Sequence, residues 1–207
     1  MTDRKKPILL FDIGNVFLFA DHEITYKHLV RQFHISLNRA KRFFKIPEYK
    51  QFCRGKINEM EFTQAIKRVL GSNDLSYEQI KKSHNIHIVK PIKSAMKVLN
   101  SIYNHSIYQI AFLTDTNAWQ NERVKQLVNF SKFSKIIIRS NEEGLTKENP
   151  ELFRQTLKRF KCKKVLFVDD SLTNIKTAET LGINSLHVAK NNPKLFSALK
   201  SKGIILN

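Results

Sequence analysis

Apolar residues follow two different patterns along this chain, and the change between them divides the sequence. Short apolar runs at residues 8–11, 109–113 and 165–168 suit strands that are buried on both faces. From about residue 21 to residue 87 the apolar positions recur at helical spacing instead. Beyond this block, strand-like and helix-like segments alternate, which is typical of a doubly wound parallel sheet. The pattern therefore predicts an α/β fold with an all-α insertion after the first strand.

Helix-start and helix-stop residues subdivide the insertion. Apolar residues on one face predict a helix over about 24–33, and a second helix that begins at Ser36 and continues through Phe44. Asn58, with a glutamate three residues later, matches a capping box, and Gly71 would end the helix that follows. Ser76 is a candidate start for a further helix.

Polar side chains follow the predicted strands at the points where chemistry is expected. Asp12 ends the first strand, Thr114 ends the second, and the adjacent Asp169 and Asp170 end the last. Lys147 precedes an Asn-Pro pair that opens an amphipathic helix. Ligands of open α/β sheets bind beyond the carboxyl ends of the strands. A carboxylate, a hydroxyl, a lysine and an acidic pair at that edge suit phosphoryl transfer through an aspartyl-phosphate with a divalent metal.

These four segments, in this order, resemble the motifs of the haloacid dehalogenase (HAD) superfamily. The resemblance covers the whole chain and implies a HAD-like Rossmannoid α/β core whose active site is closed by a helical cap. Residues 12–16 (Asp-Ile-Gly-Asn-Val) and 147–153 (Lys-Glu-Asn-Pro-Glu-Leu-Phe) are similar to a subgroup within subfamily IA. That subgroup contains sugar-1-phosphate phosphatases and the phosphatase domains of epoxide hydrolases.

The resemblance also implies a division of the chain. Residues 1–18 and 89–207 would form the α/β core, and residues 19–88 would form the cap, inserted after the first strand. Hinges near Ala20 and Val89 would join the two parts.

Catalytic roles follow from the resemblance. Asp12 would be the nucleophile that attacks phosphorus, and Lys147 would balance the negative charge of nucleophile and phosphate. Thr114 would donate a hydrogen bond to a phosphoryl oxygen, helped by the backbone amide of Asp115. Thr114, Asp115 and Lys147 would thus bind substrate, together with Arg54 from the cap.

A Mg²⁺ ion is the cofactor that the resemblance implies. Mg²⁺ prefers octahedral oxygen coordination through one or two carboxylates, with water and substrate phosphate completing the shell. Asp12, the backbone carbonyl of Gly14 and Asp170 would be its ligands. Asp169 would lie nearby and hold a metal-bound water or position Lys147.

Gly14 is a departure from the usual pattern of the superfamily, which has a second aspartate at this position as general acid and base. General acid–base catalysis contributes about 10²–10⁴-fold, so its absence restricts the chemistry. Three explanations are open. The leaving group is good enough without protonation, another residue or a water supplies the proton, or the protein binds phosphate without efficient turnover. The first explanation favours sugar 1-phosphates over simple alkyl phosphates.

Substrate selectivity is expected from side chains of the cap and of the adjoining core edge. The candidates are Phe17, Phe19, Asp21, Phe52, Arg54 and Lys56. They do not distinguish one small phosphate ester from another, and the sequence does not indicate an oligomeric state.

The composition fits one globular enzyme with an unusual charge. The 207 residues are 42% hydrophobic, and no apolar stretch approaches the ~18 residues that span a bilayer, so no membrane association is expected. Cys53 and Cys162 make neither a disulfide framework nor a metal cluster, which favours a reducing cytoplasm. The net charge of +18 permits nucleic-acid binding, but a solvated basic surface is favoured because the basic residues are spread along the chain.

Two alternatives to a phosphatase remain open. A 2-haloacid dehalogenase uses a related aspartate on carbon without a metal, but the acidic pair Asp169-Asp170 is better explained by a cation. A catalytically weak phosphate- or nucleic-acid-binding module would explain both Gly14 and the charge.

Overall fold

The centre of the protein is a parallel sheet with strand order β5-β4-β1-β6-β7. The computed structural model describes residues 6–105, 107–160, 164–191 and 193–206. The strands are β1 (Ile8–Phe11), β4 (Gln109–Thr114), β5 (Ile137–Arg139), β6 (Val165–Asp169) and β7 (Asn184–His187). All four residues of β1 are buried, as its continuous apolar run predicts for a central strand.

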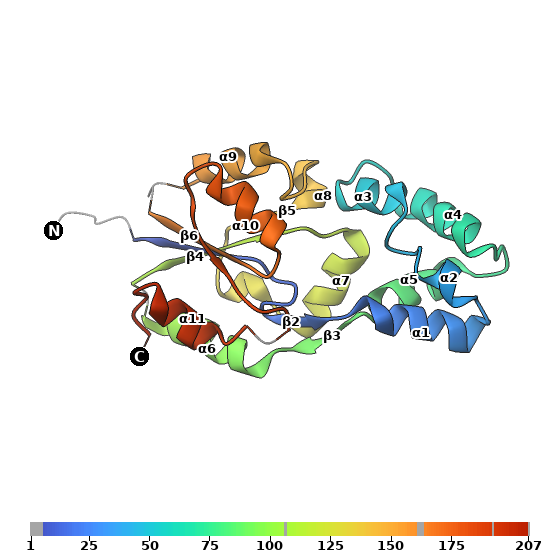
Figure 1. The fold of residues 1–207 in the computed structure, drawn as a ribbon, viewed down its shortest axis with the longest axis horizontal. Helices are drawn as coiled ribbons and strands as arrows, with labels where there is room; N and C mark the ends of the chain where they lie inside the picture. The colour runs from blue at the N-terminus through green and yellow to red at the C-terminus, as the bar shows by residue number, and fades with distance from the viewer. Residues whose placement is uncertain (1–5, 106, 161–163, 192, 207) are drawn as a thin grey trace.

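Helices cover both faces of this sheet (Figure 1). One layer contains α6 (Lys93–His105), α7 (Ala118–Leu127), the 3-10 segment η1 (Phe130–Lys132) and α11 (Leu195–Ser201). The other contains α9 (Pro150–Lys158) and α10 (Leu172–Glu179), with the short α8 (Ser140–Glu143) beside β5. Alternate residues of β1 point to the two layers, because Leu9 and Phe11 pack with the α6 side and Ile8 and Leu10 with the α9 side. The predicted doubly wound α/β fold is confirmed.

The predicted all-α insertion is also present. It lies beyond the carboxyl ends of the central strands, between β2 (Leu18–Ala20) and β3 (Ile88–Pro91), which pair antiparallel (Figure 1). Its helices are α1 (His22–Phe33), α2 (Leu37–Ala40), α3 (Pro47–Cys53), α4 (Glu59–Leu70) and α5 (Tyr77–Asn85). We call these five helices the cap. The exact domain boundaries after residues 18 and 88 stay a prediction.

The helix ends of the cap follow the sequence closely, with one exception. Asn58 and Ser76 each begin a helix with a complete capping box, and Gly71 ends α4 in the left-handed conformation at φ 63°. The helix expected from Ser36 through Phe44 stops at Ala40. Turns follow over residues 41–45, and Ile46 is extended because Pro47, which starts α3, disfavours a helical conformation at the residue before it.

The cap has its own hydrophobic core, and α7 contributes a large side chain to it. Trp119 of α7 is fully buried there, with its ring centroid 5.2 Å from that of Phe52 and 5.3 Å from that of Phe62. Its Nε1 donates a hydrogen bond to the Tyr77 hydroxyl at 3.2 Å. The cap is therefore packed onto α7, and the sequence pattern did not predict this.

The structure bears in part on the predictions about membrane association and about the two cysteines. No helix in the described ranges is long and apolar enough to cross a membrane. Cys53 is buried and free, whereas Cys162 lies outside the described residues.

Candidate active site

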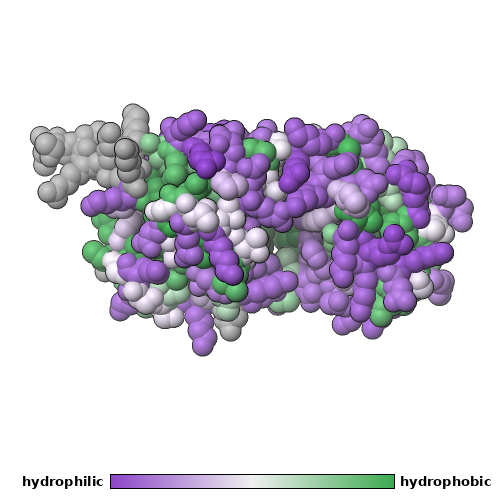
Figure 2. Space-filling view, turned by 45° about the horizontal axis from the view of Figure 1, so that its top comes forward, coloured by the Kyte–Doolittle hydropathy of each residue, from purple (hydrophilic) through white to green (hydrophobic). Residues whose placement is uncertain are grey.

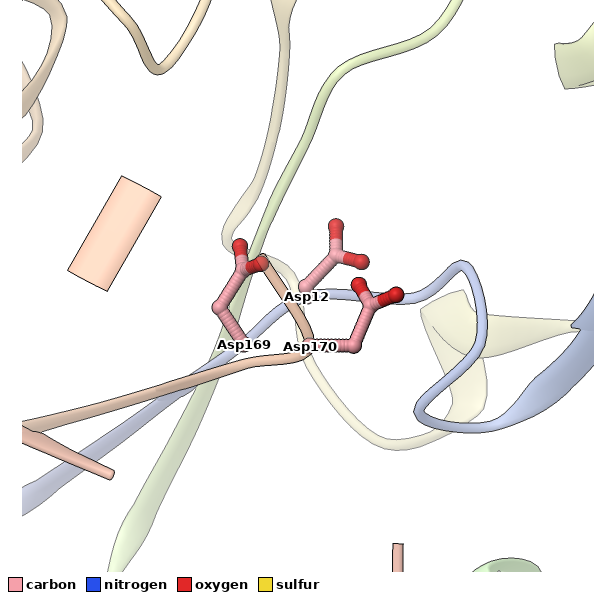
Figure 3. Close-up of side chains that lie close together, drawn as sticks. All are labelled: Asp12, Asp169 and Asp170. Atoms are coloured by element: carbon pink, nitrogen blue, oxygen red, sulfur yellow. The ribbon is translucent and has the colours of Figure 1, made fainter. Parts of the chain in front are cut away.

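Three carboxyl groups meet at the carboxyl ends of β1 and β6. Asp12 follows β1, Asp169 ends β6, and Asp170 comes next; one oxygen from each lies within 4.8 Å of the others. All three side chains extend from the strand ends to the same side (Figure 3). Strands β1 and β6 are parallel neighbours, and the Asp12 amide donates to the Val168 carbonyl at 2.9 Å. The register of the two central strands therefore brings these acids together across the sequence.

Lys147 is the buried cation of this site. Its side chain is 2% exposed, and Nζ donates to Asp12 Oδ1 at 2.7 Å and to Asp169 Oδ2 at 2.6 Å. Its backbone amide donates to Asp115 Oδ1 at 2.9 Å. Asn149 caps α9 and Pro150 is the first residue of that helix, so the helix start fixes the loop that carries Lys147.

The site contains more buried negative charge than positive charge. Burial raises the pKa of Asp12 from 3.8 to about 8, with Asp169 and Asp170 adding to the effect and Lys147 opposing it. Burial also raises the pKa values of Asp115 and Asp170. Burial disfavours the charged form of Lys147, but the carboxylates around it, Asp12 foremost, raise its pKa, so it stays protonated. A cation among the carboxylates would relieve their repulsion.

The two adjacent acids at the end of β6 are held differently. Asp169 is fully buried and accepts hydrogen bonds from Lys147, from the Ser171 amide at 2.7 Å and from Asn174 Nδ2 at 3.1 and 3.2 Å. Asp170 Oδ2 accepts one from Asn15 Nδ2 at 2.9 Å. Asp169 is thus occupied with orienting Lys147, whereas Asp170 keeps more of its oxygen lone pairs free for a ligand.

The turn after Asp12 depends on its Gly-Asn pair. Asn15 has φ 54°, a left-handed conformation that asparagine tolerates better than most residues. Its amide donates to the Leu18 carbonyl at 2.8 Å, which closes the turn. Its Oδ1 is buried and has no partner among the described residues. Asn15 was not predicted as a site residue, although its place in this turn was visible in the sequence.

A cavity of about 230 Å³ opens over these groups. Asp12, Gly14, Thr114, Asp115, Lys147 and Asp170 all line it, as the sequence predicted for one shared site. Thr114 is 7% exposed at the end of β4.

The opposite wall of the cavity includes, beside the apolar Leu18, Ala20 and Ile88, four polar side chains that were not predicted: His22, His87, Gln120 and Lys190. His22 stacks on Phe44 with ring centroids 3.9 Å apart. Lys190 is placed by the next residue, because Asn191 bonds both the amide and the carbonyl of Ala20 at 3.1 and 3.0 Å. Strand β2 and the loop after β7 are thereby clamped together beside the site.

The residues proposed from sequence for selectivity are mostly placed elsewhere. Phe17 and Phe52 are buried in the two hydrophobic cores, and Asp21 caps α1 by accepting from the Glu23 amide at 3.0 Å. Arg54 follows α3 and does not line the 230 Å³ cavity among its described residues. Phe19 lies in β2, and Lys56 contacts the loop at Gly144.

A second cavity of about 410 Å³ lies between the cap and the loop that carries Lys147. It shares Asp115 with the first cavity and is lined on the cap side by α3 and the residues just before it. Lys50 of α3 forms an ion pair with Glu148 at its wall. Space between cap and core thus continues from the acid cluster, and Figure 2 shows the largely hydrophilic surface hollowed between the two parts.

Comparison with known proteins identifies the family. The sequence model of the haloacid dehalogenase-like hydrolases matches residues 8–182. None of the curated proteins matches the chain.

Solved structures share the fold. A magnesium and inorganic phosphate complex of an aspartate-to-alanine mutant of a HAD family enzyme from Bacteroides thetaiotaomicron matches with a TM-score of 0.81 and 22% identity, over 92% of this chain and 98% of that one. A predicted HAD-like hydrolase from Porphyromonas gingivalis matches with a TM-score of 0.80 and 19% identity, over 97% of this chain and 99% of that one. L-2-haloacid dehalogenase from Xanthobacter autotrophicus matches with a TM-score of 0.65 and 14% identity, over 97% of this chain and 84% of that one.

Proposed function

Because the chain belongs to the haloacid dehalogenase-like hydrolases, we propose that it is a Mg²⁺-dependent phosphatase acting on a small phosphorylated metabolite. One observation carries the proposal. A buried lysine lies between Asp12 and Asp169 while Asp170 completes a cluster of three acids at the mouth of a cavity. This arrangement suits attack by a carboxylate on a phosphate whose charge is matched by cations.

The residues present fit a Mg²⁺ ion. The donors are hard oxygens, the acids outnumber the lysine, and Asn15 Oδ1 is a buried acceptor without a described partner. Asp12, Asp170 and the carbonyl of Gly14 would hold the ion, and this carbonyl retains a lone pair beside the hydrogen bond it accepts from Val16 at 2.6 Å. When bound, Mg²⁺ would neutralise phosphate charge and orient the ester. The Bacteroides thetaiotaomicron enzyme of the same fold binds magnesium and inorganic phosphate.

The chain's own groups then account for two chemical steps. In the first, a carboxylate oxygen of Asp12 forms a bond to phosphorus as the bond from phosphorus to the ester oxygen breaks, and the leaving group departs as an alkoxide that takes a proton from water. In the second, water attacks phosphorus, inorganic phosphate is released, and the Asp12 carboxylate is regenerated. Lys147 holds Asp12 by one oxygen, and the Thr114 hydroxyl and Asp115 amide donate to phosphoryl oxygens.

Gly14 and the opposite wall of the cavity point to the substrate class. No acid side chain at residue 14 protonates the leaving group, so an ester whose alcohol departs easily is favoured. An anomeric sugar oxygen meets this requirement. His22, His87 and Gln120 would provide hydrogen-bonding groups for sugar hydroxyls, and the cavity of about 230 Å³ suits a small ester. A sugar 1-phosphate is therefore the preferred substrate.

Phosphate release from a panel of esters, with and without Mg²⁺, tests the proposal. Release should require Mg²⁺, disappear in Asp12→Asn, and persist in Asp74→Asn, which removes an exposed carboxylate of the cap. Sugar 1-phosphates should be cleaved faster than the corresponding 6-phosphates; equal rates would refute the assignment of substrate class. Metal-independent halide release from 2-chloropropionate, with no phosphate release, would instead establish the dehalogenase alternative.

A further inference from the structure

The two helical layers that cover the sheet differ in charge. The segments 89–114, 123–141 and 180–207 contain no aspartate or glutamate. They supply α6, η1 and α11, which cover one face of the sheet (Figure 1). The exposed lysines there are Lys93, Lys97, Lys132, Lys135, Lys194, Lys200 and Lys202. We call these seven lysines, which lie on or directly beside α6, η1 and α11, the basic layer.

Most helical acids of this half of the chain lie on the other layer, with Glu122 of α7 as the exception. Glu142, Glu143, Glu151 and Glu179 belong to α8, α9 and α10. Several of them pair with arginines, as in Arg159–Glu143 at 2.7 Å and Arg154–Glu151 at 3.4 Å. In the described part of the chain, no lysine of the basic layer takes part in an ion pair. A uniformly basic composition would not separate the acids in this way.

Exposed aromatic rings accompany the lysines. Phe196 is 47% exposed, with Lys200 Nζ 5.4 Å from its ring centroid. Tyr103 is 41% exposed and packs edge-on against Phe133 at 5.5 Å, and Lys132 Nζ lies 5.8 Å from the Phe133 centroid. Lysines beside exposed rings are the combination that binds phosphates and stacks unpaired bases in single-stranded nucleic acids.

The basic layer is rigid and separate from the cavity at Asp12. Leu99 of α6 and Leu199 of α11 are fully buried beneath it, and the two helices pack against each other. None of its seven lysines lines the 230 Å³ cavity. Lys93 and Lys97 are one turn apart, a like-charge spacing that disfavours the helix. The stability of the fold does not explain why these lysines are clustered, whereas binding of a polyanionic partner does.

We propose that the basic layer binds single-stranded nucleic acid. Long-range attraction between the lysines and the phosphate backbone would guide the strand, and Tyr103 and Phe196 would each stack a base. An anionic membrane is disfavoured because the exposed rings are interleaved with lysines and do not form one continuous apolar face. The proposal is independent of the reaction at Asp12.

Fluorescence anisotropy of a labelled oligouridylate of about 20 nucleotides, titrated with the full chain over a range of KCl concentrations, tests it. The triple variant Lys93→Gln/Lys97→Gln/Lys200→Gln should bind about tenfold or more weakly, with a salt slope lower by about 2, since each lost phosphate contact removes about 0.7. The matched control is Arg154→Gln/Lys158→Gln/Lys176→Gln, which removes the same charge from the opposite layer. It should bind within about threefold of the wild type.

A double variant separates the contribution of stacking from that of charge. Tyr103→Leu/Phe196→Leu should weaken binding about tenfold or more while leaving the salt slope unchanged. Equal losses in the two triple variants would show attraction by net charge alone and overturn the proposal. Absence of oligonucleotide binding, or binding to phosphatidylserine vesicles in its place, would also overturn it. Thermal melting and turnover of each variant serve as controls for folding.

Discussion

Replacing Gly14 by aspartate should give the site the acid that it lacks. The backbone of Gly14 lies outside the left-handed region, unlike that of Gly55 or Gly144, so an ordinary residue is not strained there. A Cβ built on Gly14 would meet only Asp12 Oδ2 at 3.7 Å, an ordinary van der Waals contact. The Cβ of Gly14→Asp is therefore accommodated beside the nucleophile without backbone strain.

The expected gain in kcat/KM depends on the groups that surround residue 14. Burial and neighbouring carboxylates already raise the pKa of Asp12 to about 8, and the same causes would raise the pKa of an acid at residue 14. A carboxyl group whose pKa is raised in this way can donate a proton to a departing alkoxide. For simple alkyl phosphates kcat/KM should rise about 10²–10⁴-fold. For p-nitrophenyl phosphate, whose leaving group needs no proton, it should change less than about tenfold.

The assay compares both substrates in the wild type, Gly14→Asp and Gly14→Asn. Gly14→Asn has nearly the same shape as Gly14→Asp but cannot act as an acid, so it separates proton donation from packing. Equal gains for both esters, or the same gain with Gly14→Asn, would refute the reasoning. So would an unchanged rate on alkyl phosphates in a folded Gly14→Asp enzyme, because it would show that another group already donates the proton.

Three further predictions concern stability and metal binding. Trp119→Ala should lower the free energy of unfolding in urea by about 3–5 kcal/mol, since it empties a fully buried site between α7 and the cap; a loss below ~1 kcal/mol would contradict that packing. Burial lowers the pKa of His84 to about 3 and of His22 to about 4, so below pH ~6.5 the unfolded chain binds protons that the folded chain does not. The contribution of these histidines to stability should be complete above pH ~6.5 and be lost towards pH ~4, and His84→Gln should flatten this part of the melting-temperature profile; an equally steep profile would count against it. Added Mg²⁺ should raise the melting temperature of the wild type but not of Asp170→Asn, and an equal rise in both would remove Asp170 from the metal site.

The residues nearest the chemistry could be predicted because strand ends are visible in sequence. Asp12, Thr114 and Asp169 each end an apolar run, and parallel pairing of β1 with β4 and β6 necessarily brings such ends to one edge. Lys147 was predictable from the helix start that follows it. Their catalytic roles rest on the family resemblance, and the experiments above test them.

The cavity wall opposite these residues could not be predicted in the same way. His22 begins α1 of the cap, His87 follows α5, Gln120 lies in α7, and Lys190 follows β7. No periodicity relates these segments. They meet because β2 pairs with β3 and because Asn191 binds the backbone of Ala20. Arg54 shows the converse, since its position in the cap predicted a substrate contact but the packing of α3 places it outside this cavity.

The sequence by itself determined the alternation of strands and helices, the place of the insertion and the acids at the strand ends, because each depends on local patterning and on the geometry of parallel sheets. Only the tertiary structure decided that Trp119 belongs to the cap core, which polar groups share the cavity with the nucleophile, and that α6, η1 and α11 together form a surface without acids. Those features arise where segments distant in sequence pack together, and their contacts are not encoded in any one segment.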